Sequence, residues 1–246
     1  MPVESMEKAH LREDSPIMAL QTSMKLHSGA VQEERQTPAI GRFTTDEGHL
    51  FKYPFKYPNA GGVSMAVIKI ENVVASTSLG AELDLQAIAL ALDGAEYEPE
   101  QFPGLIYRLK EPKTATLLFR SGKAVCTGGK SLEQVKIAIG KVAKQVEAAG
   151  IAVKKDPKIE VQNIVATSDF GSKINLNAIA MTLGLENVEY EPEQFPGLVY
   201  RLASPKVVVL LFGSGKLVCT GARKPEDVEI AVDKITEELK AAGLLH

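Results

Sequence analysis

The stretch EYEPEQFPGL occupies residues 96–105 and returns without change at residues 189–198, an offset of 93. Two further stretches repeat around it. NVVAST from Asn72 matches NIVATS from Asn163, and LLFRSGKAVCTG from Leu117 matches LLFGSGKLVCTG from Leu210. Two copies are too few for a solenoid, so the repeat predicts one domain with a pseudo-two-fold axis. The expected copies are residues 65–156 and 157–246.

Each copy shows the same order of periodicities. Residues 68–76 alternate and are rich in β-branched side chains, as in a strand, and helical spacing follows near Asp84, a residue that favours a helix N-terminus. Four short extended segments separated by turn residues come next, and a long amphipathic helix closes the copy. Its expected apolar stripe is Leu132, Val135, Ile139, Val142 and Val146, with Val228, Ala231, Ile235 and Leu239 in the second copy. The pattern predicts an α+β fold in which both helices of a copy cover one face of a five-stranded antiparallel sheet.

Strand alternation identifies the residues on the uncovered face, because side chains of equal parity share a side. The pairs on that side are Asn72 with Val74, Leu117 with Phe119 and Val125 with Thr127, and in the second copy Asn163 with Val165, Leu210 with Phe212 and Val218 with Thr220. An apolar face of this kind marks a binding surface. The alternative is a third layer, from the N-terminal segment or another subunit. Cys126 and Cys219 have the opposite parity and are expected to lie in the core under the helices, with no metal or disulfide role.

Basic residues gather around this face, although the whole chain of 246 residues has a formal net charge of −3 and a pI near 5.9. Residues 101–130 contain six basic residues and one acid, and residues 194–224 contain five basic residues and no acid. The acids concentrate in the helices and in the repeated EYEPE. A rim of Lys and Arg around an apolar face fits the phosphates that border a groove of duplex DNA.

With these motifs, residues 66–246 resemble the family of TATA-box-binding proteins, and the near identity of the two copies resembles its archaeal members. The resemblance implies a saddle with a ten-stranded antiparallel sheet on its concave side and four helices on its convex side. It also implies a general transcription initiation factor that binds AT-rich promoter DNA through the minor groove and bends it. The implied partners are transcription factor B and, indirectly, RNA polymerase.

The resemblance assigns roles to residues of both copies. The implied wedges are two phenylalanine pairs, Phe102 with Phe119 and Phe195 with Phe212, one near each stirrup, which is the loop formed by the repeated stretch. The implied polar centre is Asn72, Asn163, Thr127 and Thr220, and the apolar surface is Val74, Val165, Val125, Val218, Leu117 and Leu210. The implied phosphate contacts are Arg108, Arg201, Lys123, Lys216, Ser121 and Ser214. Such a surface favours A·T pairs, because the guanine amino group would clash with it. The alternatives are ordinary core packing for the phenylalanines and a sheet-edge hydrogen bond for the asparagines.

In the family the second stirrup contacts transcription factor B, which here implies Glu191, Glu193 and Gln194. The first stirrup carries the same residues in the same order, so neighbours that differ between the copies must tell the partner which end it has reached. The candidates are Lys110-Glu111 against Ala203-Ser204, Arg120 against Gly213, and an acidic final helix (Glu226, Asp227, Glu229, Asp233) against the lysines of the first (Lys136, Lys141, Lys144).

No catalytic chemistry is expected. The four histidines, His10, His27, His49 and His246, lie outside the repeated motifs, and the sequence has no nucleophile elbow, metal-ligand spacing or phosphate loop. We therefore expect a non-enzymatic protein without cofactor or metal. The lack of a secretory pattern or a membrane-spanning apolar run predicts a cytoplasmic location, with the nucleoid. The alternative function is an interaction scaffold of the same fold that does not bend DNA. A DNA-repair glycosylase would need a further catalytic domain.

Residues 1–64 differ in composition from the rest and show no sustained periodicity up to Thr45, which predicts a disordered segment or a non-native extension. Met65 begins the family-like region. The codons of Gly61-Gly62-Val63 can spell a ribosome-binding sequence, and those of Phe51-Lys52-Tyr53 an archaeal TATA element. We hypothesise that Met65 is the native start and that the extension is translated upstream DNA, which the genomic nucleotide sequence tests.

Overall fold

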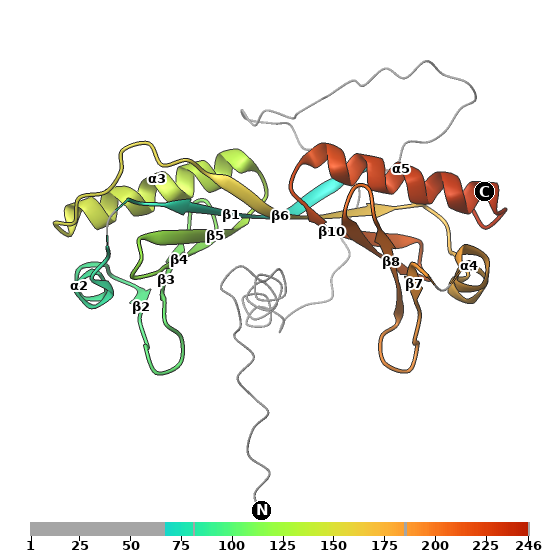
Figure 1. Ribbon diagram of the computed structural model, residues 1–246, viewed down its shortest axis with the longest axis horizontal. Coiled ribbons are helices and arrows are strands. Elements are labelled where there is room, and N and C mark those ends of the chain that lie inside the picture. Colours follow the sequence, from blue (N-terminus) through green and yellow to red (C-terminus); the bar gives the residue numbers. More distant parts are fainter. Residues whose placement is uncertain (1–66, 81, 185, 246) are drawn as a thin grey trace, which may run out of the picture.

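The computed structural model describes residues 67–80, 82–184 and 186–245 (Figure 1). The first copy contains β1 (Lys69–Ser78), α2 (Leu85–Ala91), β2 (Ala95–Glu96), β3 (Leu105–Leu109), β4 (Thr114–Leu118), β5 (Lys123–Gly129) and α3 (Leu132–Ala148). The second contains β6 (Glu160–Asp169), α4 (Leu176–Leu183), β7 (Val188–Glu189), β8 (Gly197–Leu202), β9 (Val207–Phe212), β10 (Lys216–Ala222) and α5 (Pro225–Ala241). Both copies follow the predicted order: strand, helix, four strands, helix.

The strands of the described residues form one ten-stranded antiparallel sheet in the order β2-β3-β4-β5-β1-β6-β10-β9-β8-β7. The order is palindromic when each strand is replaced by its mate in the other copy, as a pseudo-two-fold axis between β1 and β6 requires. At that axis Asn72 lies opposite Val165, and Val74 lies opposite Asn163. The two copies are therefore halves of one sheet. The boundaries predicted at residues 64–65 and 156–157 stay predictions, and residues 1–64 lie outside the described residues.

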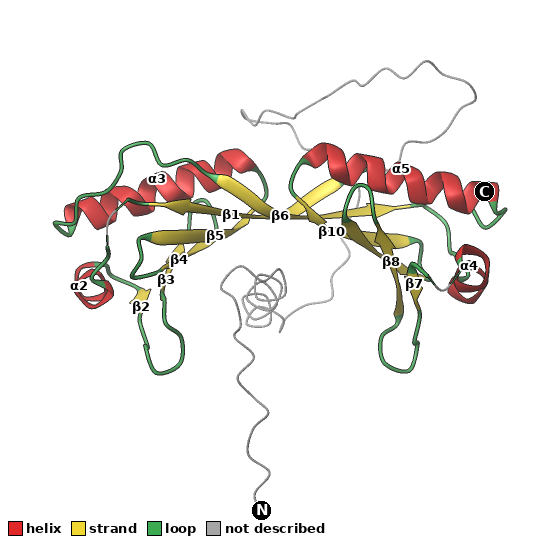
Figure 2. Ribbon diagram, in the orientation of Figure 1, coloured by secondary structure: helices red, strands yellow, loops and turns green. Residues whose placement is uncertain are grey.

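The helices cover one face of this sheet. α3 and α5 run along its convex side, and α2 and α4 lie at its outer ends (Figure 2). Val73, Ala75 and Cys126 pack in one cluster with Val135 and Ala138 of α3. The second half repeats this with Ile164, Ala166 and Cys219 against Val228 and Ala231 of α5. These contacts confirm the predicted saddle of α+β class and the position of both cysteines in the core.

Local sequence explains where the helices begin. The Asp84 carboxylate accepts the N–H groups of Gln86 and Ala87 at the start of α2, and the Ser131 hydroxyl accepts that of Gln134 at the start of α3. The Gln134 side chain reaches back to the N–H of Lys130, one residue before the cap. In α5, Pro225 occupies the first turn together with two acids, which favour a helix N-terminus.

One detail of the predicted stripes is wrong. Leu132, the first residue of α3, is 39% exposed and does not belong to the buried stripe of that helix. Ala138 takes a place in the core that the sequence interpretation did not include. None of the described helices combines the length and hydropathy needed to cross a membrane.

The two stirrups hang from the ends of the sheet, on the side away from α3 and α5 (Figures 1 and 2). They join β2 to β3 and β7 to β8. Their turns are matched: the N–H of Phe102 donates to the carbonyl of Glu98 at 2.9 Å, and the N–H of Phe195 donates to that of Glu191 at 2.9 Å. The saddle therefore presents two nearly identical stirrups that flank its concave side.

Candidate nucleic-acid interface

The strand register places the predicted surface residues on the concave face. Leu117 lies opposite Val125 and Val218 opposite Leu210, so each pair shares one side of the sheet. The register adds residues that the sequence interpretation missed: Ile106 and Ala115 in the first half, Val199 and Val208 in the second. Alternation along β3 and β8 could have found two of them, but these short strands lie between turns.

At the centre of this face, each asparagine amide is oriented by a fixed set of partners. Asn72 Nδ2 lies 3.2 Å from the Thr127 hydroxyl, and Asn72 Oδ1 accepts the N–H of Gly128 at 2.8 Å. In the second half, Asn163 Nδ2 lies 3.2 Å from the Thr220 hydroxyl, and Oδ1 accepts the N–H of Gly221 at 2.7 Å. The asparagines lie in the central strands β1 and β6 and not at a sheet edge, and each accepts a backbone hydrogen bond within the sheet. These bonds fix the orientation of the two amides.

The predicted phenylalanine pairs form at both ends of the face. The ring centroids of Phe102 and Phe119 are 5.9 Å apart with an interplanar angle of 65°, and those of Phe195 and Phe212 are 5.9 Å apart at 67°. A glycine lies beneath each pair. A Cβ at Gly104 would come within 2.7 Å of Phe102 Cε1 and 3.2 Å of Phe119 Cε1.

The second glycine, Gly197, has the same environment, with Phe195 Cε1 at 2.7 Å and Phe212 Cε1 at 3.0 Å from an added Cβ. The Phe-Pro-Gly order of the repeated stretch therefore serves two purposes: it supplies one ring of each pair and removes the side chain that would separate the rings. Phe195 is 37% exposed and the other three rings are half-buried, so none of the four is fully enclosed in the core.

The basic rim is less positive than the sequence segments imply. Arg108 forms an ion pair with Glu96 at 2.8 Å, and Arg201 forms the equivalent pair with Glu189 at 3.1 Å. All four side chains are exposed, so these ion pairs hold the guanidinium groups only weakly. Near the second phenylalanine pair, a hollow of about 520 Å³ is lined in part by Phe212, Ser214, Lys216 and Val218. Four of the predicted site residues thus meet there.

One acid on the concave face was missed. Glu71 accepts a hydrogen bond from the Thr167 hydroxyl and forms ion pairs with Lys69 at 2.7 Å and Lys130 at 3.5 Å. Its mate Gln162 donates to the hydroxyl of Ser76 at 2.8 Å. The Lys69 ammonium lowers the pKa of Glu71 against the opposing effect of burial. A register shift between Ile70 and Asn72 brings Glu71 to this side, and simple alternation cannot predict such a bulge.

Burial raises the pKa of the Cys219 thiol to about 11, and burial also raises the pKa of Cys126, so both thiols stay protonated at neutral pH. No three His, Cys, Asp or Glu side chains come together as metal ligands within the described ranges.

The fold and this face define a class of protein: a pseudo-symmetric α+β saddle with an open, largely apolar concave sheet. The chain belongs to the family described as transcription factor TFIID (or TATA-binding protein, TBP), whose model matches residues 67–149 and 158–242.

Individual relatives agree with this family. The chain is 65% identical over 178 residues to the TATA-box-binding protein of Thermoplasma acidophilum, covering 72% of this chain and 97% of that protein. It is 62% identical to TATA-box-binding protein E of Halobacterium salinarum, covering 72% of this chain and 96% of that protein. Among solved structures, Methanococcus jannaschii TBP matches with a TM-score of 0.66 and 56% identity, over 71% of this chain and 98% of that one. The similarity thus spans nearly the whole of each relative.

Proposed function

We propose that this protein is a general transcription initiation factor that binds the TATA element of promoters through the minor groove, bends the DNA there, and recruits transcription factor B and thereby RNA polymerase. The observation that carries the proposal is the concave face itself. It is apolar, it has one Asn–Thr pair on each side of its pseudo-two-fold axis, and it ends in two partly exposed phenylalanine pairs.

The polar centre supports selectivity for A·T pairs. The minor groove of an A·T pair offers only the acceptors A N3 and T O2, which suit the asparagine amide and threonine hydroxyl donors. A G·C pair adds the guanine amino group, a donor that meets Val and Leu side chains without a partner on this face. The apolar surface thus rejects G·C, and the polar centre contributes to binding A·T.

The phenylalanine pairs support bending. Apolar side chains inserted between base steps unstack them and kink the duplex toward the major groove, and the bent DNA then covers more protein surface. The pairs stand at opposite ends of the face, so each would open one end of the same site. Arg108, Arg201, Lys123, Lys216, Ser121 and Ser214 then meet the phosphates of the bent duplex.

A gel shift tests the DNA target. We expect tight binding to a TATA duplex and much weaker binding to a duplex in which G·C pairs replace the central A·T pairs, with transcription factor B supershifting only the first complex. Equal binding to both duplexes would contradict the proposal and favour the interaction scaffold.

End-to-end fluorescence measurement tests the bend. In Phe102→Ala/Phe195→Ala the bend should decrease, and the affinity should fall by about 1 to 3 kcal/mol for each stacking platform lost. Leu90→Ala/Met181→Ala is the matched control, because these mates are exposed apolar residues on α2 and α4, off the concave face. An unchanged bend in the phenylalanine variant would exclude these rings as wedges.

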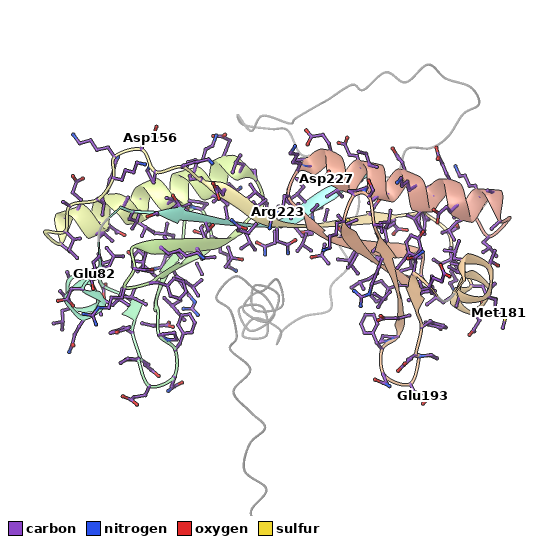
Figure 3. All side chains as sticks on the ribbon, in the orientation of Figure 1. Glu82, Asp156, Met181, Glu193, Arg223 and Asp227 are labelled. Carbon is purple, nitrogen blue, oxygen red and sulfur yellow. The ribbon has the colours of Figure 1, made fainter. Side chains whose placement is uncertain are left out.

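Charge reversal tests the partner surface. Figure 3 shows Glu193 at the tip of the second stirrup, where it is open to a partner while the concave face holds DNA. We expect Glu191→Arg/Glu193→Arg to abolish the complex with transcription factor B and leave DNA binding intact. Glu98→Arg/Glu100→Arg, the same change on the first stirrup, should do much less. Equal loss from both would show that the partner reads both ends.

The proposal also covers the division of the chain into repeats and the place in the cell where the protein acts. We take residues 65–156 and 157–246 as the two repeats that bind DNA, with residues 1–64 as an extension that DNA binding does not need. The protein acts in the cytoplasm of an archaeal cell, with the nucleoid, because its promoter targets lie there.

A further inference from the structure

The stirrups are identical in sequence, but the surfaces beside them are not. A hollow lies between the base of each stirrup and the start of the neighbouring short helix. The first, of about 480 Å³, is lined by Glu82, Leu83, Asp84, Leu85, Gln86, Tyr97 and Arg120. The second, of about 590 Å³, is lined by Lys173, Ile174, Asn175, Leu176, Tyr190, Pro196 and Gly213. These two hollows are mates under the pseudo-two-fold axis.

The backbones of the two hollows match. The N–H of Leu83 donates to the carbonyl of Arg120 at 2.9 Å, and the N–H of Ile174 donates to the carbonyl of Gly213 at 3.2 Å. Since the same backbone hydrogen bond closes both, the difference between the hollows lies in their side chains.

Those side chains reverse the local charge. The first hollow holds Glu82, Asp84 and Arg120, and Arg120 Nε donates to Glu82 Oε1 at 3.1 Å. The corresponding residues of the second hollow are Lys173, Asn175 and Gly213. The first is therefore acidic by one charge and the second basic by one. Lys173 forms no ion pair with any other described residue, and its side chain is exposed.

The fold does not require glycine at residue 213. A Cβ there would meet only the Ile174 carbonyl oxygen at 3.8 Å, an ordinary contact, and the backbone is not left-handed. An arginine like that of the first half would therefore fit. Glycine at this position leaves the hollow open beside Pro196 and Tyr190, the two ends of the second stirrup.

The opposite charges of the two hollows indicate which kind of partner surface binds better at the second stirrup. A partner that is only basic would bind at least as well to the first end, where Glu82 and Asp84 add to the acids of the stirrup. The second end instead combines an acidic stirrup with an unpaired lysine. It therefore favours a surface that carries both basic and acidic groups.

We propose that Lys173 is a specificity-determining contact of the factor B site: the partner presents a carboxylate to Lys173 beside the basic groups that it presents to Glu191 and Glu193. In the first half the same carboxylate would meet Glu82. Attraction at one end and repulsion at the other then set the direction of the complex. This inference rests on the proposed function of the second stirrup.

The test uses the full chain, a TATA duplex and transcription factor B. Lys173→Glu should weaken factor B binding to the DNA complex about tenfold or more, because like charges across an interface are strongly unfavourable. Lys173→Gln should weaken it less. Neither change should alter affinity for DNA alone. The matched control is Glu82→Gln, in the equivalent position of the first half, which should leave factor B affinity unchanged.

A second variant tests direction. Glu82→Lys/Asp84→Asn/Arg120→Gly gives the first hollow the charges of the second, and a cleavage reagent attached to factor B should then cut at both ends of the TATA duplex instead of one. Wild-type affinity for factor B in Lys173→Glu, or one-ended cutting in the triple variant, would overturn the inference while the stirrup assignment stands. Failure of the wild-type complex itself to bind factor B would remove both.

Discussion

At the centre of the concave face, Asn72 and Asn163 each accept a hydrogen bond from a backbone N–H of the neighbouring strand. Removing the amide takes the acceptor from the part-buried N–H of Gly128 or Gly221, a loss of about 0.5 to 1.5 kcal/mol for one hydrogen bond. We therefore expect Asn72→Ala and Asn163→Ala each to lower the free energy of unfolding by that amount and to reduce discrimination between A·T and G·C duplexes. Denaturant unfolding and competition binding measure the two effects. Asn177→Ala, an exposed site on α4, is the control and should change neither.

A second residue pair makes stability depend on alkaline pH. The Tyr200 hydroxyl donates to Glu238 Oε2 at 2.8 Å, and burial, reinforced by this carboxylate, raises the pKa of Tyr200 to about 12 from 10.0. A raised pKa in the folded state stabilises the protein below pH 10, and this stabilisation is lost as the pH rises toward 12. Unfolding measured between pH 9 and 12 should show a smaller decline in Tyr200→Phe than in the wild type. The control is Tyr107→Phe, because the first half has Gln145 at the position of Glu238; this variant should keep the wild-type decline. Equal slopes in all three proteins would contradict the prediction.

At the scale of elements, the arrangement of the phenylalanine rings at the stirrup and the adjoining strand depends on the absence of a side chain at Gly104. Gly104→Ala would place a Cβ 2.7 Å from Phe102 Cε1, so the rings of Phe102 and Phe119 must move apart. We expect this variant to bend DNA less than the wild type, though it retains both rings. End-to-end fluorescence measures the bend. Gly140→Ala is the control, because a Cβ there meets nothing within 4 Å; in the middle of α3 it should stabilise by about 0.5 to 1 kcal/mol and leave the bend unchanged. A wild-type bend in Gly104→Ala would show that the ring arrangement is not what opens the base step.

At the scale of the whole molecule, charge distribution matters more than net charge. The protein is acidic, yet its concave rim should release counterions from DNA, so the logarithm of affinity should fall as the logarithm of salt rises. For Arg108 and Arg201 to meet phosphate, their ion pairs with Glu96 and Glu189 must open. Glu96→Gln/Glu189→Gln should therefore raise the affinity, while the slope, roughly 0.9 for each phosphate neutralised, should stay that of the wild type. Titration by fluorescence anisotropy at several salt concentrations measures it, with Glu147→Gln on α3 as the control. A flat dependence in the wild type would mean that these arginines do not meet phosphate.

The sequence by itself determined the architecture, because a repeated pattern of periodicities specifies the order of elements, and strand alternation specifies which side chains share a face. Strand parity also placed the cysteines in the core, and the resemblance to TATA-box-binding proteins pointed to the phenylalanine pairs and the Asn–Thr centre. Only the tertiary structure decided how those residues are held. Glu71 reaches the concave face through a bulge between Ile70 and Asn72, which reverses parity and has no simple sequence pattern. Arg108 pairs with Glu96 and Arg120 with Glu82, which lie 12 and 38 positions away in the sequence. A count of charged residues within one segment therefore included these arginines but not the acids that they contact. Local pattern determines strands and faces because it acts between neighbours in the chain, whereas charge balance at a surface depends on which distant segments the fold brings together.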